Sequence, residues 1–323
     1  MKPPGSWRHE TVLAAVVVAL MVGIGLVNPA FWTLANFFDL LKASVVTGIL
    51  ALGVLIVLIS GGIDISFTAI AAFAMYVTCW ISVSLGGEGS VLLGLLLAVG
   101  MGTGLGLINA CFIGGLRLPT LIVTLGTAGV FHGFLLAFIG TEIINTLPPA
   151  YVRFSRWQGF RQTLSGGETI GLSVTVLALV AAAVIVGVLL RRTVLGRSIY
   201  ALGGNPEAAH RIGIRVARVQ FLIYGLVGGL AGLAGLIHAV MMRNANPSDL
   251  VGTELNVLAA AVLGGASIFG GRGSVAGTLL GVWLIVVLNN SLILLGVPSY
   301  WQRVWVGATI VVSTAISARR RSS

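Results

Sequence analysis

The chain has 323 residues, of which 57% are hydrophobic and only 9% are charged, and its mean hydropathy is +1.04. A soluble domain carries roughly 25% charged residues, so this composition excludes an ordinary soluble protein and makes lipid the solvent for most of the surface. The net charge of +10 then indicates basic loops on one side of a bilayer, not nucleic-acid binding.

The apolar segments in chain order predict an all-α, polytopic transmembrane helix bundle. They lie at residues 11–27, 44–60, 65–85, 90–115, 119–140, 169–190, 217–241, 253–269, 274–296 and 302–317. Most have the ~20 residues that span a ~30 Å hydrocarbon layer, where backbone groups must pair within a helix. Segments 44–60 and 253–269 are short and glycine-interrupted, and either is compatible with a broken or re-entrant helix. We therefore expect about ten spans, with a range of eight to ten, in one membrane domain covering 1–323.

Basic residues predict the orientation. With a cytoplasmic N-terminus and about ten spans, 13 of the 19 Lys and Arg residues fall on the cytoplasmic side. This bias places both termini in the cytoplasm and the chain in a bacterial inner membrane. The same topology places Ser60–Gly62 inside and Glu254 outside.

Glycines divide into two kinds. Gly225, Gly228, Gly229, Gly232 and Gly235 recur at three- and four-residue steps, which is typical of closely packed membrane helices. Two other groups interrupt apolar segments, in the stretches SGGIDISFTAIAA (60–72) and LGGASIFGGRGSVAG (263–277). Their likeness is consistent with an internal duplication, as found in transporters, although it does not fit a clean five-plus-five inverted repeat.

Polar residues inside the apolar segments are candidates for a translocation path. We assign this role to Asp64, Asn109, Thr124, Thr127 and Asn289, because a polar solute that crosses the membrane needs hydrogen-bonding groups. Each has a structural alternative: Asp64 at the edge of a span can cap the helix that follows it, and the others can join helices. No nucleophile–base or metal-ligand spacing lies within the spans, so we expect no enzymatic activity, metal or cofactor.

The polar connection at 191–218 predicts a short cytoplasmic helix. Asn205 can cap it, Pro206 suits its first position, Glu207 complements the helix dipole and Gly213 ends it. Such a helix suits a protein that receives force from a cytoplasmic partner. The chain itself has no G-x-x-x-x-G-K-[ST] phosphate loop.

At this connection the sequence resembles the permease subunits of ABC importers. Glu207-Ala208-Ala209 and Gly213 are similar to the EAA-x-x-x-G pattern of their coupling loop. The stretches SGGIDIS (60–66), LPTLIVTLGT (118–127) and VLGGASIFGGRGSVAGTLLG (262–281) resemble the branch that imports ribose, xylose, galactose, rhamnose and autoinducer-2. The resemblance extends from about residue 40 to residue 315 and includes the spacing of these motifs.

The resemblance implies the partners. These are two cytoplasmic ATP-binding subunits or one tandem ATPase, a second permease copy or a sister permease, and an extracytoplasmic solute-binding protein. It also implies that Asn205, Glu207, Ala208, Ala209 and Gly213 couple the chain to the ATPase. A branched-chain amino acid permease remains an alternative within the class. An ion-coupled secondary carrier is an alternative of a different class, and a non-transporting scaffold is a third.

Overall fold

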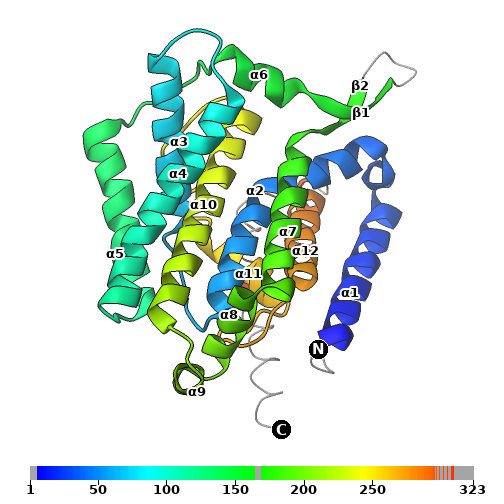
Figure 1. The fold of residues 1–323 in the computed structure, drawn as a ribbon. Coiled ribbons are helices and arrows are strands. Elements are labelled where there is room, and N and C mark those ends of the chain that lie inside the picture. The colour runs from blue at the N-terminus through cyan, green and yellow to red at the C-terminus, as the bar shows by residue number, and fades with distance from the viewer. Residues whose placement is uncertain are drawn as a thin grey trace.

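The structure is a computed structural model that describes residues 6–163 and 169–294, together with residues 296, 298, 301, 304, 307 and 308. Helices dominate these residues (Figure 1). In chain order the elements are α1 (Ser6–Val27), η1 (Pro29–Trp32), α2 (Leu34–Ile59), α3 (Phe67–Ser84), α4 (Val91–Ala110), η2 (Cys111–Gly115), α5 (Thr120–Phe134), η3 (Leu135–Ile139), α6 (Pro149–Arg156), β1 (Gln158–Thr163), β2 (Thr169–Ser173), α7 (Thr175–Arg192), α8 (Val194–Gly204), α9 (Pro206–Arg211), α10 (Val216–Met242), α11 (Glu254–Leu263) and α12 (Val275–Leu294).

Eight helices in the described part of the chain are long and apolar enough to cross a membrane, which agrees with the predicted all-α polytopic bundle. They comprise α1, α2, α3, α4 extended by η2, α5 extended by η3, α7, α10 and α12. The predicted segment 302–317 falls almost wholly outside the described residues. The predicted start of segment 169–190 is wrong, because residues 169–173 form a strand and the helix begins at Thr175.

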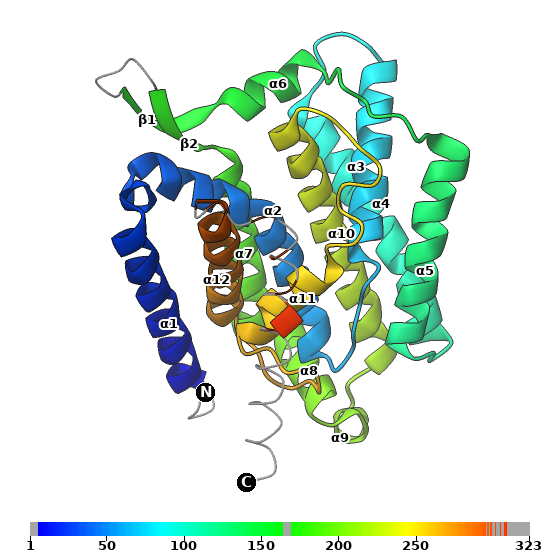
Figure 2. The same ribbon diagram turned by 180° about the vertical axis from the view of Figure 1, so that it is seen from behind.

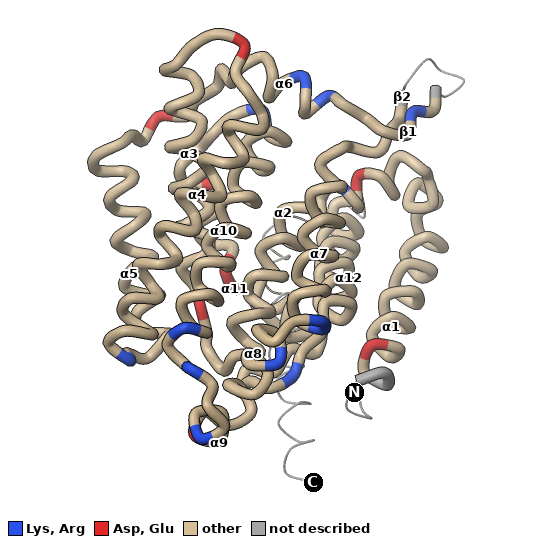
Figure 3. Tube along the Cα trace, viewed as in Figure 1, with Lys and Arg blue, Asp and Glu red and all other residues tan. Residues whose placement is uncertain are grey.

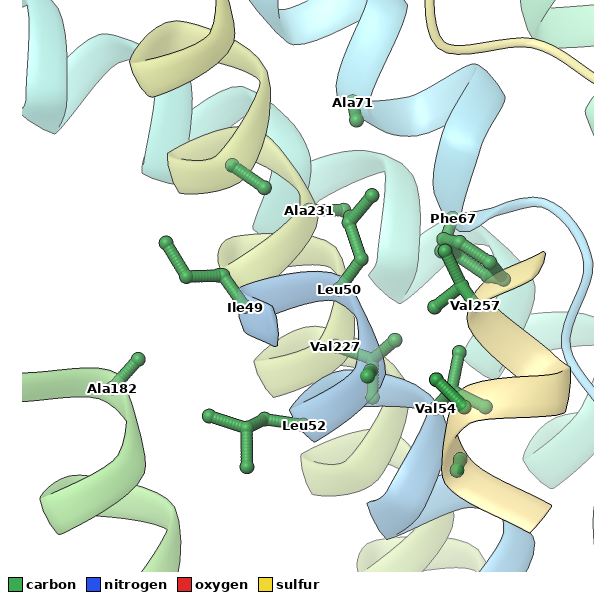
Figure 4. Packing of buried hydrophobic residues seen from close by; sticks show 14 of the residues in the cluster. Ile49, Leu50, Leu52, Val54, Phe67, Ala71, Ala182, Val227, Ala231 and Val257 are labelled. Carbon is green, nitrogen blue, oxygen red and sulfur yellow. The ribbon is translucent and has the colours of Figure 1, made fainter. Parts of the chain in front are cut away.

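Helix α2 lies at the centre of the bundle and packs against α7, α10, α11 and α12. The possibility that segment 44–60 is a broken helix is wrong, since α2 runs without interruption for 26 residues. From Gly48 to Ile59 it is buried on every side, as expected of a helix that is apolar all round. Figure 4 shows its side chains Leu50, Leu52 and Val54 among residues of α3, α7, α10 and α11.

Helices α4 and α10 pack backbone to backbone through glycines of both helices, and on α10 these include Gly228 and Gly232, which the sequence marked for packing. A Cβ on Gly102 of α4 would clash with the carbonyl oxygen of Gly228 on α10, and a Cβ on Gly228 would clash with that of Gly102. Gly106 and Gly232 face Tyr224 and Ala98 in the same way. Only glycine allows helix axes to come this close.

The two ends of the bundle differ. At one end, here called the α6 end, α6 leads into an antiparallel pair of strands in which Arg161 lies opposite Gly171. At the other, here called the α9 end, α8 and α9 project together (Figures 1 and 2). Figure 3 shows Lys and Arg residues near α8 and α9 at one end and near α6 and β1 at the other. The helices α1 and α5 occupy opposite flanks.

Candidate functional site

Between α2 and α3 the chain runs without helix from Gly61 to Ser66. Gly61 adopts a φ of +85°, a left-handed conformation that glycine takes without strain, and so turns the chain out of α2. Backbone groups of an extended segment inside a membrane protein cannot pair with lipid, so neighbouring helices must supply their partners.

Two threonines of α5 supply those partners. The Thr120 hydroxyl oxygen accepts the N–H of Ile63 at 3.2 Å, and that of Thr124 accepts the N–H of Ile65 at 3.4 Å. The Thr124 hydroxyl also lies 3.3 Å from the Ile63 carbonyl oxygen, within donating distance. The two threonines are four residues apart and therefore share one face of α5. This face holds the extended segment in place along the helix.

Asp64, Ser66 and Asn109 form a buried hydrogen-bonded group at the start of α3. One oxygen of the Asp64 carboxylate accepts both the N–H and the hydroxyl of Ser66, each at 2.7 Å. The Asn109 amide of α4 donates to the Ser66 hydroxyl oxygen at 2.8 Å. All three side chains are at most 1% exposed. Asp64 thus holds Ser66, which is the N-cap residue of α3, but does not itself cap the helix, so the capping role that the sequence offered as the structural alternative for Asp64 is wrong.

Glu254, which begins the short helix α11, contacts α3 two residues after Ser66. Its carboxylate accepts hydrogen bonds from the Thr68 hydroxyl and, at 3.0 Å, from the N–H of Gly252. Glu254 is the first residue of α11, which has only 10 residues and is therefore about 15 Å long. The far end of α11 reaches the α9 end of the bundle, where His9 of α1 lies 3.0 Å from the Leu263 carbonyl oxygen.

These contacts place the starts of α3 and α11 inside the bundle, about halfway across it. A helix of about 15 Å covers half of a ~30 Å hydrocarbon layer. The sequence placed Glu254 on the outer surface, and this placement is wrong, because Glu254 bonds Thr68 inside the bundle. Asp64 lies three residues before α3, in keeping with its predicted place at the edge of a span. A stretch without helix precedes each of the helices α3 and α11 and carries the chain into the bundle, and sequence hydropathy does not register the depth of such a stretch.

The chain before α11 enters from the α6 end. Ala245 and Ile144 exchange two backbone hydrogen bonds of 3.0 Å in an isolated antiparallel bridge. Just before it, Arg243 donates to the Ser155 hydroxyl of α6 at 3.1 Å. From Ala245 the chain runs through turns to Thr253 and is helical only from Glu254 to Leu263, which agrees with the predicted broken or re-entrant helix at 253–269.

We call the group Asp64, Ser66, Thr68, Asn109, Thr120, Thr124 and Glu254 the mid-bundle cluster. Three predicted path residues, Asp64, Asn109 and Thr124, lie in it. Thr127 follows one turn later on α5 and bonds only its own helix, at the Thr124 carbonyl oxygen. Asn289 lies on α12, which packs against α1, α2 and α11, and none of the hydrogen bonds described for the cluster involves it.

The sequence interpretation missed Ser66, Thr68, Thr120 and Glu254. Glu254 carried a usable signal, since an acidic residue followed by only nine mostly apolar residues before Gly264 marks the start of a helix that is too short to span a membrane. Two cluster oxygens, Oδ2 of Asp64 and Oδ1 of Asn109, have no hydrogen-bond partner among the described residues. The cluster thus combines two helix N-termini with spare acceptors, an arrangement suited to polar recognition.

At the α9 end, the predicted short helix is present as α9. The Asn205 side chain accepts the N–H of Ala208 at 3.0 Å, so Asn205 is the N-cap as expected. Gly213 follows the helix with a φ of +88°. Ala209 is buried, whereas Glu207 and Ala208 are exposed. Helix α9 therefore has one face buried against the bundle and one exposed face, and the residues for which a coupling role is predicted lie on both.

The sequence missed a second helix in this connection. Helix α8 precedes α9, and the Thr193 hydroxyl caps it by accepting the N–H of Gly196 at 3.0 Å. On the exposed side of α9, Glu207 lies 3.6 Å from Arg211 in an ion pair whose side chains are 85% and 80% exposed. Such a pair contributes little to stability, roughly 0.3–0.5 kcal/mol, so these charges remain free to meet a partner.

The fold and the two sites define the class of protein. A polytopic helix bundle with two discontinuous crossings that meet mid-bundle at polar residues is the architecture of a membrane transporter. Residues 36–314 match the family described as the permease component of the branched-chain amino acid transport system, and the chain belongs to this family of transport permeases. It is accordingly a multi-pass protein of the inner membrane.

Curated relatives cover nearly the whole chain. The ribose import permease protein RbsC of Bacillus subtilis is 38% identical over 301 residues, which is 93% of this chain and 90% of the relative. The L-arabinose ABC transporter permease protein AraH of Azospirillum brasilense is 33% identical over 98% of this chain and 91% of its own length. The autoinducer 2 import system permease protein LsrC of Yersinia enterocolitica is 29% identical over 97% and 83%. No solved structure matches the chain significantly.

Proposed function

We propose that this chain is the membrane-spanning permease of an ABC importer for a monosaccharide or sugar-like solute, acting as one membrane domain. The observation that carries the proposal is the mid-bundle cluster, where Thr68 of α3 meets Glu254 of α11. The names of the relatives, which specify ribose, arabinose and autoinducer-2 import, point to the same solute class.

The chemistry of the cluster favours a neutral, hydroxyl-rich solute. Its described hydrogen bonds involve carboxylates, hydroxyls and an amide, and no Lys or Arg takes part. An amino acid solute carries a carboxylate that would need a cationic or strongly donating partner in this apolar setting. Sugar hydroxyls can instead donate to the spare acceptors of Asp64 and Asn109.

Helix α9 is the proposed contact with the ATPase. Its exposed face presents Glu207 and Ala208, and its buried face anchors it through Ala209. In this proposal the α9 end is cytoplasmic, and closure of two ATP-binding subunits, or of one tandem ATPase, displaces α9. A second permease copy or a sister permease completes the pathway, and a solute-binding protein delivers solute at the α6 end.

Reconstitution tests the proposal. The chain is co-purified with candidate ATP-binding subunits, inserted into liposomes, and supplied with a candidate binding protein and radiolabelled D-ribose, L-arabinose or L-leucine. ATP-dependent accumulation of a sugar is expected, without accumulation of leucine. Leucine uptake would refute the solute class. Uptake that needs no ATP and is abolished by an ionophore would refute the ABC mechanism and favour an ion-coupled carrier.

A further inference from the structure

Three separate chain segments meet at the α9 end through glycine backbones. They are the turn after α2 at Gly61, the end of α8 at Gly203, and the loop between α11 and α12 at Gly270 and Gly271. The N–H of Gly271 donates to the carbonyl oxygen of Ile59, the last residue of α2, at 2.8 Å. We call Gly61, Gly203, Gly270 and Gly271 the glycine junction.

Side chains are sterically excluded from the junction. A Cβ on Gly203 would clash with the Ile59 carbonyl oxygen and would lie 2.6 Å from the Gly271 nitrogen. A Cβ on Gly270 would lie 2.9 Å from the Cα atoms of both Gly203 and Gly61. All of these opposing atoms are backbone atoms, which cannot rotate away. The next residue, Gly204, differs sharply, because a Cβ there would meet nothing within 4 Å.

A side-chain hydrogen bond reinforces the same contact. The Tyr200 hydroxyl of α8 donates to the Gly273 carbonyl oxygen at 2.8 Å. Burial raises the pKa of Tyr200 above its ordinary value, so the phenol stays protonated and remains a donor. Tyr200 and Gly203 lie three residues apart and therefore on one face of α8. This face holds the loop between α11 and α12 at two points.

The segments that meet here are the ones that continue into the mid-bundle cluster. Beyond Gly61, the extended segment reaches Asp64 and the start of α3. Before Gly264, helix α11 reaches back to Glu254 in about 15 Å. On the third side, α8 continues directly through Asn205 into α9. The junction is thus a close backbone contact between the projecting helices and both discontinuous crossings.

We propose that the glycine junction transmits displacement of α8 and α9 to both discontinuous crossings at once, with Gly203 and Tyr200 as the positioning residues that hold α8 against them. This inference rests on the proposed coupling of α9 to an ATPase. It also gives a role to the two similar glycine stretches of the sequence, 60–72 and 263–277, whose glycines lie in contact through α8. A shift of α8 moves the turn after α2 and the loop after α11 together, and with them the two ends that meet at Thr68 and Glu254.

The test compares Gly203→Ala with its neighbour Gly204→Ala in the reconstituted complex. Both variants make the same chemical change in α8, but only the first disturbs the junction. Three quantities are measured for each: co-purification of the ATP-binding subunits, ATP hydrolysis with and without the loaded binding protein, and solute accumulated per ATP hydrolysed. We expect Gly203→Ala to retain the ATP-binding subunits while solute accumulated per ATP falls at least tenfold, and Gly204→Ala to match the unmodified chain.

The tyrosine provides a second variant that removes no packing. Tyr200→Phe deletes only the hydroxyl that bonds Gly273, and we expect a two- to tenfold fall in solute accumulated per ATP with normal assembly. A purely structural role would lower hydrolysis and uptake in parallel and leave their ratio unchanged, which would overturn the inference. If Gly203→Ala does not fold, Tyr200→Phe provides the test. Solute accumulated per ATP that equals the value for the unmodified chain would then overturn the inference. Failure of the unmodified chain to bind the ATP-binding subunits would instead refute the proposed function.

Discussion

Replacing Gly102 by alanine is expected to separate α4 from α10 and to lower the free energy of unfolding. The added Cβ would clash with the carbonyl oxygen of Gly228 and lie 2.9 Å from the nitrogen of Gly232. Both atoms belong to the backbone of a buried helix, so relief requires the helix axes to move apart. Overpacking of this kind costs roughly 1–3 kcal/mol, and separation also weakens the neighbouring Gly106 contact.

Gly104→Ala is the matched control for this prediction. Gly104 lies on the same helix, is exposed, and would place its Cβ within 4 Å of nothing described. Alanine is favoured over glycine in a helix by roughly 0.5–1 kcal/mol, and this gain applies to both variants. The difference between the free energies of unfolding of the two variants therefore reports the packing cost alone, and it should be about 1–3 kcal/mol. Unfolding in mixed micelles titrated with sodium dodecyl sulfate measures it, and equal stability of the two variants would refute the close approach of α4 and α10.

Three further variants address the sites. Thr124→Val removes the acceptor for the Ile65 N–H and should lower the free energy of unfolding by about 1–3 kcal/mol. Thr127→Val is the control and should change this free energy far less, because the Thr127 hydroxyl bonds only its own helix. Comparable losses for the two variants, measured by unfolding in micelles, would contradict the prediction. Thr68→Val removes the hydrogen bond to Glu254 and should weaken the contact between α3 and α11 by roughly 1.5–3 kcal/mol. Amide hydrogen exchange in α11 should therefore become faster, and unchanged exchange would argue against the contact. Asn205→Ala should destabilise α9 by about 1 kcal/mol and reduce ATP-driven uptake. Asn205→Asp keeps a capping oxygen and should retain both the stability of α9 and the uptake. Equal uptake by the two variants would refute the role of the cap.

The features predicted correctly from the sequence are those that local chemistry determines. Hydropathy located the membrane helices, because lipid requires long apolar segments. The Asn205–Gly213 pattern located α9, because capping and chain reversal depend on residues within one turn. Glycine spacing marked α10 for close packing, and burial of Gly228 against Gly102 confirmed it. Each of these signals lies within a short stretch of chain.

Tertiary structure alone decided how deep each segment lies and what it meets. An apolar stretch reads alike whether it spans the bundle, as α2 does, or stops halfway, as α11 does. The cluster depends on Thr68 and Glu254, which are 186 residues apart, and the glycine junction joins three segments that each carry a glycine pair but nothing that tells which pairs meet. Such contacts arise when helices pack and buried polar groups must find partners, and the identity of a distant partner is not encoded in local spacing. The sequence by itself therefore determined that this protein crosses a membrane and carries a projecting capped helix, whereas packing decided that two crossings break and meet at a polar site inside it.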